Sequence, residues 1–286
     1  MVKFYPSIPD DLREWMLTQH VFFTASAPLT GRHINVSPKG HPSETFAILN
    51  PNQVAYLDAT GSGSETISHI YEHGNGRVTL LFTSFDAAPR ILRCFCRGKV
   101  VERDDAAFPE WIKRMRAAGL ETPPGAKEEE GQVGLRQGDE GWLKGIRAAV
   151  ILDVFKVQTS CGFGVPLLGS EAYSPESTAD VEPETHRLQK EGWNDRPTMP
   201  RWAIKQAAKR GLEPYRRGNN WRSLDGLPGL KAARRDRGQW LWFDDGKAWA
   251  TGRAQQWESV LCGVVIAVIV IALLNRIGLL QMEWVS

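Results

Sequence analysis

Apolar and polar residues alternate along several short stretches of the N-terminal part of the chain, which is the pattern of half-buried β-strands. Turn residues such as Asn50-Pro51-Asn52 separate these stretches at even spacing. The pattern predicts strands over residues 21–26, 34–36, 45–49, 54–58, 77–83, 90–101 and 148–158. Many short strands with regular turns and an inserted helix indicate a small antiparallel β-barrel.

The apolar period becomes helical over residues 9–20, 62–73 and 109–118. In the second of these helices, Ser62 and Glu65 have the spacing of a capping box, so the helix is expected to begin at Ser62. Residues 121–140 are polar and rich in Gly, Pro and Glu, which is typical of a surface excursion.

The composition changes after Gly169, where Ser, Pro, Glu and Thr predict a linker over 169–190. The following region, 191–257, is basic and rich in tryptophan. Its tryptophans are Trp193, Trp202, Trp221, Trp240, Trp242, Trp249 and Trp257. Such a region suits an anionic membrane face, and it could also stack on single-stranded nucleic acid or build a small accessory core. The first interpretation is favoured, and nucleic acid is not expected as a partner, because a long apolar run follows directly.

That apolar run extends from Val260 to Leu274 and resumes after Asn275-Arg276. By itself it is shorter than the about 20 residues of a membrane-spanning helix, but counted through Leu280 it suffices. Trp257 and Trp284 bracket it, as interfacial anchors do. The sequence therefore predicts a C-terminal transmembrane anchor over 258–281, with the barrel domain, 1–168, facing the cytosol.

The formal net charge of the 286 residues is +2, which implies no particular partner. The charge is unevenly distributed, because 187–253 contains 16 Lys and Arg against 7 Asp and Glu. The four cysteines form no CxxC pair, and reduced thiols are expected. His69 and His73 lie four apart on a predicted helix, but no third ligand accompanies them, so no metal site is predicted.

Polar residues with phosphate-binding chemistry gather on the second predicted strand and at the glycine-rich turn before the 62–73 helix. These residues are Asn35, Ser37 and Lys39 on the strand, with Thr60, Ser62 and Ser64 at the turn. A phosphate needs a cation, hydroxyl donors and free backbone N–H groups. The glycine-rich segment 61–64 is also typical of any flexible turn, so the pattern alone leaves both interpretations open.

Six motifs follow one another along residues 10–168. They are the segments 22–26, 31–40, 56–66, 77–82, 90–100 and 158–166, and Asn35-Val36-Ser37-Pro38-Lys39-Gly40 is the most specific part. In this order they resemble the pyridoxamine 5'-phosphate oxidase-related family of flavin-binding split barrels.

The resemblance implies a mainly β fold, a six-stranded split antiparallel β-barrel with a few helices, forming a homodimer with FMN at the subunit interface. It implies that Asn35, Ser37 and Lys39 hold the phosphate together with Thr60, Ser62 and Ser64. Arg90 and Arg93 stand where the family often has a basic residue on a later strand. The flavin would carry the redox chemistry, so no catalytic residue is assigned.

The sequence departs from that family in two places. True pyridoxamine phosphate oxidases have a basic residue at each end of the second-strand motif and a C-terminal substrate-binding segment with paired basic residues. Here the strand motif ends at Ser37-Pro38-Lys39, and the chain has no convincing counterpart of that C-terminal segment. Both differences count against vitamin B6 oxidation. The expected function is an FMN-dependent oxidoreductase that acts on an unidentified small molecule. The alternative is a non-catalytic module, tethered to a membrane, that binds flavin, deazaflavin or haem.

Overall fold

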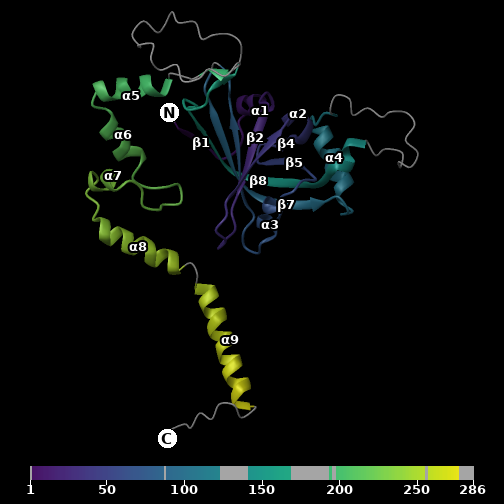
Figure 1. Cartoon of the computed structure of the whole chain (residues 1–286), viewed down its shortest axis with the longest axis vertical. Coiled ribbons are helices and arrows are strands. Elements are labelled where there is room, and N and C mark those ends of the chain that lie inside the picture. Colours follow the sequence, from purple (N-terminus) through teal and green to yellow (C-terminus); the bar gives the residue numbers. More distant parts are fainter. Residues whose placement is uncertain are drawn as a thin grey trace, which may run out of the picture. The chain divides into compact units, whose positions relative to one another are not determined.

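A computed structural model of the chain describes residues 2–86, 88–122, 141–168, 193–194, 198–254 and 257–276. The chain divides into two compact units, Met1–Met199 and Pro200–Ser286 (Figure 1). The predicted linker over 169–190 lies outside the described residues, and so do residues 123–140 of the excursion predicted over 121–140.

The first unit is built on one eight-stranded antiparallel sheet with the strand order β3-β2-β6-β7-β8-β5-β4, to which β1 adds by pairing with β8. The strands are β1 (Lys3–Tyr5), β2 (Val21–Ser26), β3 (Asn35–Gly40), β4 (Phe46–Asn50), β5 (Gln53–Ala59), β6 (Arg77–Thr83), β7 (Ile91–Glu102) and β8 (Ile146–Ser160). The prediction of six strands was therefore too low, although the seven ranges read from the alternation pattern each contain one strand. The eighth, β1, is too short to show an alternation pattern.

The sheet curls around an aromatic core, which gives it the form of a half-barrel. Phe22 on β2 stacks on Phe82 of β6, with ring centroids 5.3 Å apart, and Phe46 of β4 lies 5.3 Å from both rings. Tyr56 of β5 meets Phe22 edge-on at 5.9 Å. Strands from both ends of the strand order thus share one core, so β3 and β5 lie opposite each other without being hydrogen-bonded neighbours.

The helices of the first unit are short and pack on this sheet. They are α1 (Asp10–Leu17), α2 (Pro42–Thr45), α3 (Glu65–Tyr71) and α4 (Phe108–Ala117). α3 begins three residues later than predicted, and neither Ser62 nor Ser64 caps it with a side-chain hydrogen bond. α3 is fixed to β2 by the 2.8 Å hydrogen bond between His69 Nδ1 and Ser26 Oγ. A 3₁₀ turn, Gly141–Gly145, leads into β8, and the short strands β9 (Leu167–Leu168) and β10 (Trp193–Asn194) pair with each other.

The second unit is helical in its described part. Its helices are α6 (Leu212–Asn219), α7 (Lys231–Arg235), α8 (Leu241–Ala254) and α9 (Trp257–Arg276), and α5 (Thr198–Ala208) leads into it. α5 covers most of the basic segment 200–210. The aromatic segment Trp240-Leu241-Trp242-Phe243 leads into α8, which begins at Leu241.

The apolar C-terminal run is helical in its described part, as α9 (Trp257–Arg276). Residues 277–281 of the anchor predicted over 258–281 lie outside the described residues. Among the helices of the described residues, none is long and apolar enough to cross a membrane. The transmembrane anchor is therefore not supported.

The cysteines differ in their environment, which gives a first testable prediction. Cys94 and Cys96 are buried on β7, and burial raises the pKa of the Cys94 thiol to about 12, whereas Cys161 is exposed. Because the thiolate is the reactive form, we expect iodoacetamide at neutral pH to alkylate Cys161 and to spare Cys94 and Cys96. Peptide mass spectrometry before and after unfolding in guanidinium checks this result. Modification of Cys94 in the folded protein would contradict the burial.

Candidate functional site

The polar residues of β3 lie on one face of the strand. Asn35, Ser37 and Lys39 are two residues apart, so their side chains point the same way, and their β2 partners Ser26, Thr24 and Phe22 are all buried. The Ser37 hydroxyl donates to Asn35 Oδ1 at 3.0 Å, and Asn35 Nδ2 donates to Thr66 Oγ1 on α3 at 2.9 Å. β3 is thereby linked to the start of α3 through polar side chains.

Lys39 reaches across the opening of the half-barrel to Asp58 on β5. The Lys39 Nζ atom lies 2.8 Å from Asp58 Oδ1, and the Asp58 side chain is only 3% exposed. The second carboxylate oxygen, Oδ2, accepts from Arg147 Nε at 2.7 Å. One buried carboxylate therefore holds two cations, and each cation keeps about a quarter of its side-chain surface open to solvent (24% for Lys39, 28% for Arg147).

Arg147 reaches this position because of an irregularity in β8. Asp58 pairs with Ala148, but the next residue, Ala59, pairs with Ile146, so Arg147 is the extra residue of a β-bulge. A bulge turns a side chain away from the regular alternation of a strand. The Arg147 guanidinium also donates to the backbone carbonyls of Gly61 at 3.4 Å and Gly63 at 2.5 Å, which fixes the glycine-rich turn.

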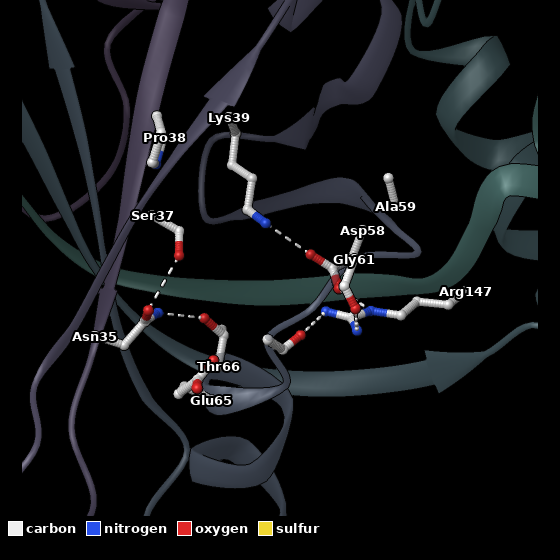
Figure 2. A pocket seen from close by; sticks show the side chains of 11 residues that line it. Asn35, Ser37, Pro38, Lys39, Asp58, Ala59, Gly61, Glu65, Thr66 and Arg147 are labelled. Carbon is white, nitrogen blue, oxygen red and sulfur yellow. Dashed lines mark hydrogen bonds and ion pairs between the residues drawn. The ribbon is translucent and has the colours of Figure 1, made fainter.

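These residues surround a cavity of about 240 Å³. Figure 2 shows the β3 side chains on one side of it, with Asp58 and Arg147 on the other and Thr66 below. The lining residues are Asn35, Ser37, Pro38, Lys39, Asp58, Ala59, Gly61, Gly63, Glu65, Thr66 and Arg147. We call this set the β3–Arg147 cavity. It combines two cations, two hydroxyls and one amide with two carboxylates, of which that of Glu65 belongs to an exposed residue.

A buried tyrosine lies beside the ion pairs. Lys39 Nζ lies 5.7 Å from the centre of the Tyr56 ring, a cation–π contact. The Tyr56 hydroxyl is buried without a hydrogen-bond partner among the described residues. Burial raises the pKa of Tyr56 well above its usual value, and the nearby Asp58 carboxylate raises it further. Tyr56 is therefore a neutral phenol throughout the physiological pH range.

The structure brings three of the eight predicted cofactor residues into the cavity, namely Asn35, Ser37 and Lys39. Thr60, Ser62 and Ser64 belong to the glycine-rich turn before α3, but they do not line the cavity. The residues that alternate with them, Gly61, Gly63 and Glu65, do line it. The Thr60 amide donates to the Gly145 carbonyl at 2.7 Å, and the Ser64 hydroxyl lies 3.4 Å from that of Ser68. The structure therefore places the three predicted hydroxyl residues of this turn outside the lining of the cavity.

Arg90 and Arg93 lie away from the cavity within this chain. The Arg90 guanidinium stacks on the ring of Trp15, 5.4 Å from its centroid. Leu92 is the cross-strand neighbour of Phe82, which pairs with Phe22, which in turn pairs with Lys39. These residues therefore share one face of the sheet, and Leu92 is buried there, whereas Arg93 is the next residue along β7. Because neighbouring residues of a strand point to opposite faces, Arg93 faces the other side of the sheet. Neither arginine lines the cavity.

Sequence reasoning missed Asp58 and Arg147. Asp58 could have been noticed as a charged residue that ends an apolar strand, 54–58. Arg147 stands directly before a strongly apolar strand and offered no signal, because the bulge that directs it depends on the pairing of β8 with β5.

A curated relative from Aspergillus flavus, the pyridoxamine 5'-phosphate oxidase family protein ustO, is 42% identical to this chain over 284 residues. The alignment covers 99% of this chain and 100% of the relative. The chain belongs to the pyridoxamine 5'-phosphate oxidase family. This confirms the resemblance seen in the sequence motifs. The alignment with the relative also includes the sequence of the C-terminal unit of this chain.

Solved structures show more distant similarity. HupZ from Group A Streptococcus is 15% identical, with a TM-score of 0.36, over 54% of this chain and 99% of that chain. A FAD-binding protein from Mesorhizobium loti is 10% identical, with a TM-score of 0.34, over 56% of this chain and 99% of that chain. No profile of a known protein family matches the chain.

Proposed function

We propose that this pyridoxamine 5'-phosphate oxidase family member is a flavin-dependent oxidoreductase that binds the phosphate of FMN in the β3–Arg147 cavity. The observation that carries the proposal is the convergence of Lys39 and Arg147 on one small polar cavity next to Asn35 and Ser37. The substrate is an unidentified small molecule, and the flavin supplies the redox chemistry when bound.

The donor set of the cavity fits a phosphate. An ammonium has three N–H donors and a guanidinium has five. Among the described residues, Lys39 uses one of its donors on Asp58, and Arg147 uses three on Asp58, Gly61 and Gly63. Both cations are therefore held in place and still have donors for a ligand. With Asp58 and Glu65 the cavity lining has no net formal charge, but the Asp58 carboxylate holds both cations in place and so reduces the entropy lost when they bind an anion.

The donor set fits haem less well. Haem iron is held by His, Cys, Met or Tyr side chains, and none of these residue types lines the cavity. Deazaflavin cofactors stay open as an alternative, since the cavity recognises a phosphate and makes no contact that would distinguish the ring. The absorption spectrum of the chromophore released on denaturation separates flavin from deazaflavin and haem.

The size of the cavity indicates that it holds only part of the cofactor. Pockets that enclose a drug-sized ligand measure about 300–1,000 Å³, which is more than the volume of about 240 Å³ seen here. The flavin ring would thus lie outside it, against another surface. Ile34 and Val36, 76% and 62% exposed, alternate with the cavity residues of β3 and so face the other side of the strand. We propose that a second copy of the chain covers these two apolar side chains, as a homodimer.

Comparison of FMN with riboflavin tests the proposal, because the two differ only in the phosphate. Charge-assisted hydrogen bonds contribute about 1.5–3 kcal/mol each, so two such bonds favour FMN by at least about 100-fold in Kd. Titration of the cofactor-free protein, followed by quenching of flavin fluorescence, measures both affinities. Equal affinities, or no binding of FMN, would refute the phosphate site.

The alternative of a non-catalytic carrier has one observation in its favour. The ionisable side chains Lys39, Asp58 and Arg147 are already paired with one another, so none of them stands free as an acid or base. Stopped-flow spectroscopy distinguishes the two functions. An oxidoreductase has its bound flavin bleached by NADH or NADPH and recoloured by an oxidant, whereas a carrier shows neither reaction at a useful rate.

A further inference from the structure

A cluster of exposed aromatic residues marks the C-terminal unit. The tryptophans of the barrel, Trp15, Trp111 and Trp142, are half-buried against its two apolar cores. By contrast, five large aromatic side chains close together in sequence stand open to solvent: Trp240, Trp242, Phe243, Trp249 and Trp257. Trp242 is 73% exposed. Trp242 contacts the rings of Trp240 and Phe243, at 6.3 and 5.9 Å between centroids, and exposed apolar groups that lie together mark an interaction surface.

The helix that follows these aromatic residues has no polar side along its apolar run. Val264, Val265 and Ile266 are exposed in succession, and so are the four residues 268–271. Since an α-helix turns about 100° per residue, four consecutive exposed apolar residues point to every side of α9. A helix that is apolar all round needs apolar surroundings on all sides. A second protein packed on one side would leave the other sides in water.

The residues before the aromatic cluster are strongly basic. Residues 198–254 contain thirteen Lys and Arg against five Asp and Glu. Arg234 is buried and paired with Asp245 at 2.7 Å, and Arg222 and Arg237 stack on Trp221. Other basic residues, such as Lys205, Lys209 and Arg216, are exposed. This excess of positive charge complements an anionic surface.

We propose that the C-terminal unit docks on an anionic lipid bilayer. α9 enters the acyl region, the exposed tryptophans lie at the level of the headgroups, and the basic side chains of α5 to α8 face the anionic lipids. Single-stranded nucleic acid would match the basic and aromatic residues, but it would leave α9 exposed. The bilayer is the partner that satisfies all three features. The inference does not depend on the flavin site.

Flotation of the full-length chain with vesicles tests this inference. The probes are vesicles of phosphatidylcholine alone and vesicles of phosphatidylcholine mixed with phosphatidylserine. We expect the chain to float with the mixed vesicles and to bind them at least about tenfold more tightly than the neutral ones, with the preference lost at high salt, because headgroup attraction is screened. Equal binding to both, or no flotation with either, would overturn the proposal, as would retention on a single-stranded oligonucleotide in place of the vesicles.

Two sets of variants separate the contributions. The double variant Lys205→Glu, Lys209→Glu is expected to weaken binding to mixed vesicles by at least about 25-fold. Each basic residue near an anionic membrane surface raises the binding affinity about fivefold. The matched control, Lys99→Glu with Lys113→Glu on the barrel, should leave binding unchanged. Val265→Lys with Val268→Lys in α9 should abolish flotation with both kinds of vesicle, because lysine is costly in the acyl region. Full binding by either test variant, or equal loss by the control, would refute the assignment.

Discussion

Replacement of Lys39 or Arg147 by methionine is expected to lower the affinity for FMN by about 10- to 100-fold in each case. Either change removes one charge-assisted hydrogen bond to the phosphate, which is worth about 1.5–3 kcal/mol. Asp58 keeps the other cation as a partner, so the buried carboxylate is not left without a counter-ion. Methionine preserves most of the side-chain volume, so the cavity should keep its shape. Fluorescence titration with FMN measures the change.

Riboflavin provides the internal control for these variants. Because it lacks the phosphate, its affinity should stay within about twofold of that of the unaltered protein. Arg93→Met gives a second comparison, since Arg93 lies on the opposite face of the sheet within one chain. If Arg93→Met lowers FMN affinity while Lys39→Met does not, the phosphate lies elsewhere. If Arg93 and Lys39 both matter, the partner copy contributes Arg93 to the site.

Phe22→Ala is expected to reduce the free energy of unfolding by about 3–5 kcal/mol, the range seen for large aromatic residues in cores. Phe22 is fully buried and contacts three other rings, those of Phe46, Tyr56 and Phe82. Its removal leaves a cavity where both ends of the curled sheet meet. The change is measured by urea unfolding of residues 1–286 with the FMN concentration held constant, because bound ligand raises the apparent stability.

Phe155→Ala is the matched control, because the same side chain is removed from an exposed position on β8. We expect a change of less than about 0.5 kcal/mol. A loss at Phe155 as large as that at Phe22 would mean that Phe155 is covered in the folded protein, for example by a second copy. A loss below about 1 kcal/mol at Phe22 would contradict the aromatic core described above.

Much of the fold and part of the site could be predicted from local sequence patterns. The apolar residues of 21–26 indicated a buried strand, and the period of two that begins at 34–36 placed Asn35, Ser37 and Lys39 on a common side of β3. These properties depend on residues close together in the chain. Helix α3 (Glu65–Tyr71) was also predicted, but it begins three residues later than expected, because Ser62 does not cap it.

The features that escaped prediction depend on pairing between distant strands. The side of the sheet that Arg93 faces follows from its register opposite Leu81 and Gln158, which no local pattern reveals. The ion pairs of Asp58 depend on the curl that brings β3 over β5 and on an irregularity in β8. For α9, the apolar run was evident from the sequence, and the structure describes it as a helix through Arg276.

The bulge residue Arg147 also limits which sequence changes this protein can tolerate during evolution. On one side of it, β8 directs Ala148 and Val150 into the interior, and on the other side the pairing resumes at Ile146. Loss or gain of one residue nearby would exchange the two faces along one arm of the longest strand, and near Arg147 both of these faces are buried. Substitutions near Arg147 can therefore alter the cavity alone. Insertions and deletions there would disturb both the cavity and the packing of the core. Length variation among relatives should be rare around position 147 and more frequent in the connections between strands.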